Sequence, residues 1–184
     1  MSARRRPASL ALSLVRHAKS SWDDATLPDH ERPLAPRGIK AATRMNSYLA
    51  DEDLVPDLVL SSDSVRTRAT CALLFAPLDV PAPPVVTTRD LYLADADAIL
   101  EVVRREGAAH TQARHIMVIG HNPGLQLLAL SLPGNAARPD IEQLAVKFPT
   151  AALAHFIFEA GDWSQIAPGR ARLERFIVPT ALKG

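Results

Sequence analysis

Short apolar runs and helix-like segments alternate through most of the chain, and this alternation constrains the fold more than any other feature. The runs of strand length lie at residues 9–15, 57–60, 83–88, 115–119, 152–158 and 173–178. The segments with helical spacing of apolar residues lie at residues 36–49, 64–75, 95–105 and 124–130. Such alternation is typical of α/β proteins, and continuously apolar strands are typical of a parallel sheet covered on both faces. The sequence therefore predicts a single α/β domain with a mostly parallel β-sheet flanked by helices on both faces.

The predicted domain covers residues 9–184, because 184 residues fit one domain of ordinary size and contain no internal repeat. Residues 1–8 are basic and are predicted to form a tail. Residues 1–14 also have the outline of a signal peptide, but the apolar run ends in charged residues without a cleavage site of small residues. The proline-rich segments 77–84 and 133–139 are predicted to be connections.

Composition excludes several classes of protein. The 21 Lys and Arg residues almost balance the 20 Asp and Glu residues, so no overall basic field indicates a nucleic-acid-binding protein. The single cysteine, Cys71, cannot form an internal disulfide, which suits a reducing compartment. No apolar run approaches the ~18 residues of a transmembrane helix. We therefore expect a cytoplasmic protein that binds neither nucleic acid nor a membrane, and the sequence leaves its oligomeric state open.

Charged and polar side chains follow three of the apolar strands at the point where each strand ends. Arg16 and His17 follow the first strand, and His121 follows another. A third strand ends at residues 61–62 and continues into a helix that carries Arg66. Because ligands of α/β sheets gather at the carboxyl ends of parallel strands, we expect these side chains to converge.

Two arginines and two histidines in one place suit the transfer of a phosphoryl group. Arginine stays protonated, and its planar fork binds phosphate through two hydrogen bonds. A neutral imidazole is a nucleophile near pH 7, and a second imidazole can donate to oxygens on which charge develops. The six histidines show no H-x-x-H or H-E-x-x-H spacing, so we predict no metal site.

Three motifs together resemble the histidine phosphatase superfamily, the group related to phosphoglycerate mutase. They are the pair Arg16-His17, the pair Ser61-Ser62 followed by Arg66 and Thr70, and the triplet Gly120-His121-Asn122. Each motif is weak alone, but all three occur in the family's order and spacing and span nearly the whole chain. Further stretches are similar to the SixA branch, which is named for phosphohistidine phosphatase activity: Arg-His-Ala-Lys-Ser at 16–20, Arg-Pro-Leu at 32–34, Arg-Gly at 37–38 and Gly-His-Asn-Pro-Gly at 120–124.

The resemblance implies a role for each matching residue. It implies that His17 is the nucleophile that takes up the phosphoryl group, and that Arg16, Arg66 and His121 form the phosphate pocket. Ser20 and Asn122 complete the substrate-binding set that we predict. The resemblance implies no metal and no organic cofactor, and it implies a mixed, mostly parallel sheet.

The sequence departs from the family's pattern at the proton donor. Many members carry a Glu shortly after the third strand, whereas residues 89–95 hold none. Asp90, Asp95, Asp23 and Asp24 are the alternatives, and we assign the role to none of them. Two smaller departures are Ala18 and Asp63, where many relatives have Gly and Pro.

The missing acid favours one class of substrate over another. An alkoxide leaving group needs a general acid, which contributes roughly 10²–10⁴-fold in rate. An imidazole leaving group has a conjugate acid near a pKa of about 6.5 and leaves without such help. We therefore expect a phosphohistidine protein, such as a phosphotransfer domain, as the substrate. The alternatives are a small-molecule phosphomonoesterase that acts on a sugar or nucleotide phosphate, a non-catalytic module that recognises phosphate, and a mutase.

Several further residues carry two interpretations. Arg32 and Arg37 either rim the pocket, where they receive the acidic surface of a phosphoprotein, or form surface ion pairs. Arg68 is expected to face solvent or an acidic neighbour. Trp22 and Trp163 either line an entrance or anchor the fold, and we favour the anchors. The remaining histidines are interpreted as structural: His30, His110, His115 and His155.

Overall fold

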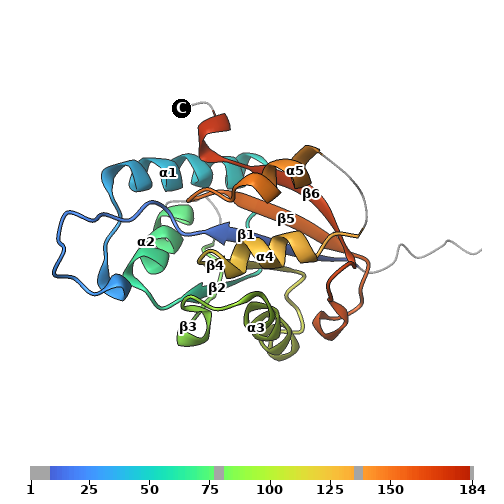
Figure 1. Ribbon diagram of the computed structural model, residues 1–184. Coiled ribbons are helices and arrows are strands. Elements are labelled where there is room, and N and C mark those ends of the chain that lie inside the picture. Colours follow the sequence, from blue (N-terminus) through green and yellow to red (C-terminus); the bar gives the residue numbers. More distant parts are fainter. Residues whose placement is uncertain (1–8, 77–80, 135–138, 183–184) are drawn as a thin grey trace, which may run out of the picture.

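The computed structural model describes residues 9–76, 81–134 and 139–182 (Figure 1). The predicted tail, residues 1–8, lies outside the described residues, as do parts of the two proline-rich connections. Six strands form one sheet in the order β3-β2-β4-β1-β5-β6. They are β1 (Leu10–Arg16), β2 (Leu58–Ser62), β3 (Val85–Thr88), β4 (His115–Gly120), β5 (Leu153–Phe158) and β6 (Ala171–Ile177). Strands β1 to β4 pair in parallel, and β5 is antiparallel to both of its neighbours, β1 and β6, which confirms the mostly parallel sheet.

Helices cover both faces of this sheet, as predicted (Figure 1). The longer ones are α1 (Pro36–Asp51), α2 (Val65–Leu74), α3 (Ala96–Ala109), α4 (Gly124–Ser131) and α5 (Pro139–Val146). Short 3₁₀ turns lie at η1 (Asp29–Glu31), η2 (Arg89–Leu91), η3 (Trp163–Gln165) and η4 (Pro179–Ala181). Within the parallel strands, alternate residues supply two cores. Leu14 and Val118 pack with α3 and α4, whereas their neighbours Val15 and Ile119 pack with α1 and α2.

Side-chain caps explain where two of these helices begin. The Ser64 side chain accepts from the backbone N–H of Thr67 at the start of α2. The Asp95 side chain accepts from the backbone N–H of Ala98 at the start of α3. Such caps satisfy N–H groups that have no partner within the helix. The helices therefore begin directly after the loops that carry the polar residues of the strand ends.

Helix α5 corrects the sequence prediction, which placed no element between residues 131 and 151. The segment carries a proline at its start and two acidic residues, Asp140 and Glu142, in its first turn. These features suit a helix N-terminus. Leu144 is fully buried and Ile141 packs against the main core. The apolar face of this short helix therefore consists of these two residues. Eight residues are too few to show a convincing period in the sequence.

The register of the parallel strands brings the predicted motifs together. Arg16 of β1 pairs with Gly120 of β4, so His17 and His121 are the next residues beyond two aligned strand ends. Ser61 of β2 pairs with Ile119 of β4, which places Ser62 at the same edge. Among the described helices, none is long and apolar enough to cross a membrane.

Candidate active site

His17 lies in a buried position with one ring nitrogen held by the backbone. Its Nδ1 lies 2.8 Å from the carbonyl oxygen of Ala18, and because a carbonyl only accepts, Nδ1 carries the proton. The lone pair is therefore on Nε2. Burial, followed by the charges of Arg66, Arg16 and Arg32, lowers the pKa of His17 to about 4, although the Ala18 hydrogen bond opposes this shift. The imidazole is thus neutral at pH 7, which is the state that a nucleophile needs.

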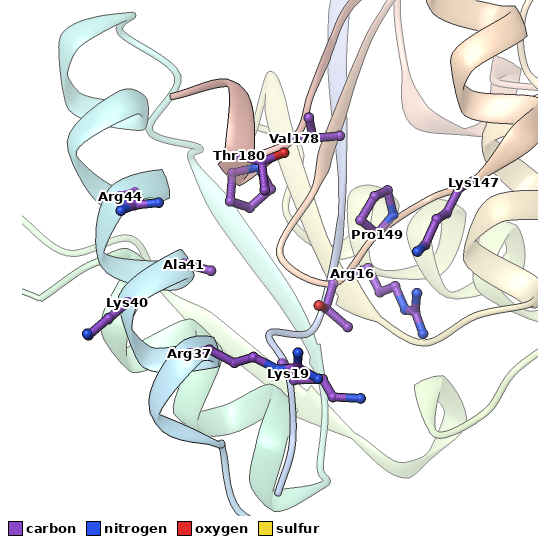
Figure 2. Close-up of a pocket in the computed structure, with 12 residues that line it drawn as sticks. Arg16, Lys19, Arg37, Lys40, Ala41, Arg44, Lys147, Pro149, Val178 and Thr180 are labelled. Carbon is purple, nitrogen blue, oxygen red and sulfur yellow. The ribbon is translucent and has the colours of Figure 1, made fainter. Parts of the chain in front are cut away.

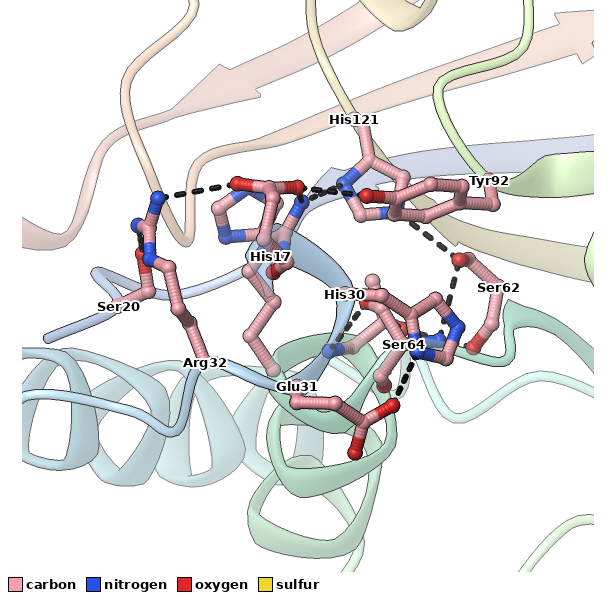
Figure 3. A network of polar contacts seen from close by, with 12 residues as sticks. His17, Ser20, His30, Glu31, Arg32, Ser62, Ser64, Tyr92 and His121 are labelled. Carbon is pink, nitrogen blue, oxygen red and sulfur yellow. Dashed lines mark hydrogen bonds and ion pairs between the residues drawn. The ribbon is translucent and has the colours of Figure 1, made fainter. Parts of the chain in front are cut away.

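His121 faces His17, with ring centroids 5.1 Å apart (Figure 3). Its Nδ1 lies 3.3 Å from Nη2 of Arg66, and because a guanidinium only donates, Nδ1 accepts. Its Nε2 then donates to the Ser62 hydroxyl at 2.9 Å. Burial, together with the nearby His17 and Arg66, lowers the pKa of His121 to about 3. Both histidines are therefore neutral and fixed in opposite tautomers.

Three arginines surround the two histidines. Arg66 is 3% exposed and Arg32 is 6% exposed, which is rare for charged side chains. Arg16 donates through Nη1 to the carbonyl of Phe148 at 2.9 Å, and its buried Nε has no partner among the described residues. Arg32 donates to the Ser20 hydroxyl and to the Ser21 carbonyl. Buried guanidinium groups with spare donors suit a dianionic ligand such as phosphate.

Asp29, on η1, joins two of these arginines and was missed by the sequence analysis. Its Oδ2 accepts from Arg66 at 2.8 Å and from the Tyr92 hydroxyl at 2.7 Å, and its Oδ1 accepts from Arg32 at 3.0 Å. Burial alone would raise the pKa of Asp29, but the hydrogen bonds from Tyr92 and Arg66 and the arginine charges outweigh it and lower the pKa. The carboxylate is therefore ionised at neutral pH.

One pocket of about 300 Å³ collects these groups, and we name it the central pocket. All six predicted site residues line it: Arg16, His17, Ser20, Arg66, His121 and Asn122. Its other lining residues are Lys19, Trp22, Asp29, Arg32, Leu93 and Thr150. Trp22 is 68% exposed and lies over Arg32 at 3.3 Å from ring centroid to guanidinium carbon, so the prediction of a buried anchor was wrong for Trp22. Trp163 is 3% exposed and does anchor the core.

The other candidates lie outside the central pocket. None of Asp23, Asp24, Asp90 and Asp95 lines it. Asp90 pairs with Arg105, Asp95 caps α3, and Asp24 accepts from Thr26. Arg68 is exposed and Arg37 lies in a neighbouring cavity. Among the described residues, no group of three or more His, Cys, Asp or Glu side chains is placed to hold a metal ion.

The remaining histidines form local networks. His115 and His155 both hydrogen-bond to the Ser13 hydroxyl, at 2.8 and 2.9 Å. His30 contacts Asp63 at 2.8 Å and packs edge-on against Tyr92, so it supports the wall that carries Asp29. The contact with His30 explains Asp63, where a proline would offer no acceptor.

Comparisons with known proteins agree with the fold. Residues 12–92 match a family model of the histidine phosphatase superfamily, branch 1. An uncharacterized protein of Mycobacterium tuberculosis is 36% identical over 168 residues, which cover 90% of this chain and 99% of that one. A SixA phosphohistidine phosphatase candidate from Nakamurella multipartitia superposes with a TM-score of 0.78 at 26% identity, covering 93% of this chain and 96% of that one. A mycobacterial glucosyl-3-phosphoglycerate phosphatase shows the same fold, with a TM-score of 0.63 at 17% identity over 90% of this chain and 97% of that one.

Proposed function

The chain belongs to the histidine phosphatase superfamily, and from that premise we propose that it removes the phosphoryl group from phosphohistidine on a protein. The observation that carries the proposal is that the central pocket holds both a neutral His17 and an ionised carboxylate, that of Asp29. His17 presents an unprotonated Nε2 beside three arginines. Asp29 is held ionised by two of them and therefore offers no proton to a leaving group.

The proposed reaction has two steps. Nε2 of His17 attacks phosphorus while the bond from phosphorus to the substrate imidazole nitrogen breaks. The other nitrogen of the substrate ring carries a proton, so the ring keeps the electron pair of the broken bond and leaves as neutral imidazole. Its conjugate acid has a pKa of about 6.5, and the step therefore needs no proton from the enzyme. A water molecule then attacks the phosphohistidine on His17, releasing inorganic phosphate and the free imidazole.

The surrounding groups stabilise charge during both steps. Arg16, Arg32 and Arg66 neutralise the phosphoryl oxygens, and buried donors are stronger here than they would be in water. His121 is held by Ser62 and Arg66, so its ring is fixed before the substrate arrives. As negative charge enters the pocket, the pKa of His121 rises and the ring can donate from both nitrogens.

Asp29 also supports the alternative, a small-molecule phosphomonoesterase. It is a carboxylate that lines the central pocket, and a protonated Asp29 would be placed to assist an alkoxide leaving group. Its lowered pKa disfavours this role, because a general acid must be protonated at the working pH. One solved structure with the same fold is named as a glucosyl-3-phosphoglycerate phosphatase. The experiment therefore includes phosphate monoesters as substrates.

The experiment measures phosphate release from a phosphorylated histidine phosphotransfer domain and from a panel of phosphate monoesters, with EDTA present. Wild type, His17→Ala and Asp29→Asn are compared. We expect release from phosphohistidine that is lost in His17→Ala and kept in Asp29→Asn. Release mainly from monoesters, with a loss of about 10²–10⁴-fold in Asp29→Asn, would establish the phosphomonoesterase instead. Phosphate binding without any turnover would indicate a recognition module.

A further inference from the structure

A second cavity, of about 670 Å³, adjoins the central pocket, and we name it the basic groove (Figure 2). Six of its lining residues are cationic: Arg16, Lys19, Arg37, Lys40, Arg44 and Lys147. Arg16, Lys19 and Thr150 line both cavities, so the two are continuous. In Figure 2, Arg37 extends from α1 toward Lys19 and Arg16, while Lys147 lies on the opposite side. A ligand in the groove therefore lies beside a phosphoryl group in the central pocket.

Among the described residues, the charges of the basic groove have no anionic partner. No described acidic side chain lines the groove. The side chains of Lys19, Arg37, Lys40, Arg44 and Lys147 form neither an ion pair nor a hydrogen bond to any described residue. The groove takes six of the 21 basic residues, which leaves the rest of the chain with more acidic than basic residues. Like charges at close range repel one another, and an anion bound among them would relieve this repulsion.

The N-terminal end of α1 packs closely against one edge of the groove, and the charge of its first turn is unfavourable for the helix. The backbone of Lys19 accepts from Ala35 at 2.8 Å, directly before the helix begins. A Cβ at Gly38 would lie 2.2 Å from the Lys19 carbonyl oxygen, so only glycine lets α1 approach this closely. The first turn of α1 carries Arg37 and no acidic residue, although the helix dipole favours negative charge there. Helix stability therefore does not explain this charge pattern.

We propose that the basic groove docks an acidic segment of the phosphoprotein substrate next to its phosphohistidine, an inference that rests on the proposed function. Exposed, unpaired Lys and Arg side chains on two opposite walls suit an extended acidic surface, which they attract before contact. A small anion would instead call for side chains held in place by hydrogen bonds, as in the central pocket. No aromatic side chain lines the groove, and single-stranded nucleic acids are usually bound by stacking.

The test changes the two walls separately. Arg37→Glu with Arg44→Glu alters the α1 wall, and the new Glu at 37 suits the first turn of the helix. Lys147→Glu alters the opposite wall. Arg68→Glu is the matched control, since Arg68 is exposed, unpaired among the described residues, and lines neither cavity. The substrates are a histidine phosphotransfer domain with carboxylates around its phosphohistidine, the same domain with those carboxylates changed to amides, and free phosphohistidine.

We expect kcat/KM for the acidic domain to fall about tenfold or more in the α1-wall variant and several-fold in Lys147→Glu at low salt. The loss resides in KM, shrinks at high salt, and is absent for the amide domain and for Arg68→Glu. Turnover of free phosphohistidine stays within about twofold of wild type, which also shows that the variants fold. An unchanged kcat/KM for the acidic domain overturns the inference. An equal loss on free phosphohistidine does so too, because the groove would then belong to the phosphate site.

Failure of the proposed function is distinguishable from failure of the groove. If wild type releases phosphate from neither form of phosphohistidine, the proposed function is wrong. Binding of the labelled acidic domain to His17→Ala, with and without the wall substitutions, still measures the groove directly. If the acidic domain binds with equal affinity to His17→Ala with and without the wall substitutions, the docking inference is overturned. An affinity about tenfold weaker with the substitutions supports it. A loss confined to bisphosphorylated small molecules would assign the groove to a second phosphate and also overturn it.

Discussion

The central pocket and the basic groove share Arg16 and Lys19, yet they hold their charges in opposite ways. In the pocket, Arg32 and Arg66 are almost completely buried and both bind Asp29. In the groove, the cations form no ion pair with any residue that the structure describes, and those on α1 are exposed to solvent. The same residue types therefore serve two purposes. Charges fixed before the ligand arrives can stabilise a transition state, whereas exposed charges mainly accelerate and select an encounter.

Burial explains why the two regions differ. A buried charge without a partner is strongly destabilising, so the pocket needs Asp29 to hold its arginines while no phosphate is present. A surface charge is solvated by water, and an ion pair there contributes at most about 1 kcal/mol. The groove can therefore leave its cations unpaired at small expense. The comparison predicts large effects for changes in the pocket and small, salt-dependent effects at its edge.

The largest effect is expected for the nucleophile. His17→Ala removes the only imidazole whose free nitrogen is Nε2 in the described pocket, and turnover should fall by about four orders of magnitude or more. Acid-quenched labelling should show a phosphoenzyme in wild type and none in this variant. The groove variant Arg37→Glu is the control and should label fully. A phosphoenzyme that persists in His17→Ala would move the nucleophile to His121.

The buried imidazoles outside the central pocket should make the stability of the fold depend on pH. Burial lowers the pKa of His115 and of His155 to about 4. Between pH 6.5 and 4 the unfolded chain binds protons that the folded chain does not, so stability is complete above pH 6.5 and is lost as the pH falls. Each histidine contributes up to about 1.4 kcal/mol per pH unit.

Urea unfolding at pH 7.5, 6.0 and 5.0 measures this loss. His155→Gln should reduce the slope by about one proton, because one buried titrating group is removed while Ser13 keeps a hydrogen-bond partner. The exposed-site variant Arg68→Gln should leave the slope unchanged. An identical slope in His155→Gln and wild type would mean that His155 is protonated in the folded protein.

A smaller effect is expected from Asp29, the residue that gives the pocket its internal partner. Asp29→Asn removes the negative charge that competes with phosphate for Arg32 and Arg66, so inorganic phosphate should bind about five- to tenfold more tightly. Titration calorimetry with phosphate measures this change. Asp63→Asn is the matched control, because Asp63 binds His30 and Arg89 instead. Weaker phosphate binding in Asp29→Asn would show that the carboxylate mainly positions the arginines.

The sequence predicts the sheet and the strand-end residues because both follow from local patterns. Apolar runs ending in Arg16-His17 and before His121 locate two neighbouring strand ends, and parallel pairing aligns them. The sequence did not predict helix α5, because the apolar face of this helix contains only Ile141 and Leu144. Its existence depends on contacts with elements far away in the sequence.

The sequence did not place Asp29 in the pocket for a different reason. Its loop has no periodicity, and the carboxylates considered from the sequence lie only at residues 23–24 and 89–95. Only the folded chain shows that Arg32 and Arg66, from two separate segments, require a common partner when the pocket is empty. Trp22 was misplaced for a related reason. Its size predicts burial, but the cation–π contact with Arg32 keeps it at the pocket mouth.

The smallest effect is expected at that mouth, where the pocket passes into exposed surface. The Trp22 ring covers the Arg32 guanidinium at an exposed site, and such a contact contributes about 0.5–1 kcal/mol. Trp22→Ala should therefore raise KM about two- to fivefold without changing kcat, and Trp22→Phe should recover part of the loss. Leu93→Ala is the control, since Leu93 lines the same mouth without contacting a cation through a ring. Because Trp163 is buried in the core, a change in tryptophan fluorescence on adding phosphate reports Trp22. A loss in kcat greater than about tenfold would place Trp22 against the reacting groups, and the boundary between buried and exposed charge would then lie further out than Arg32.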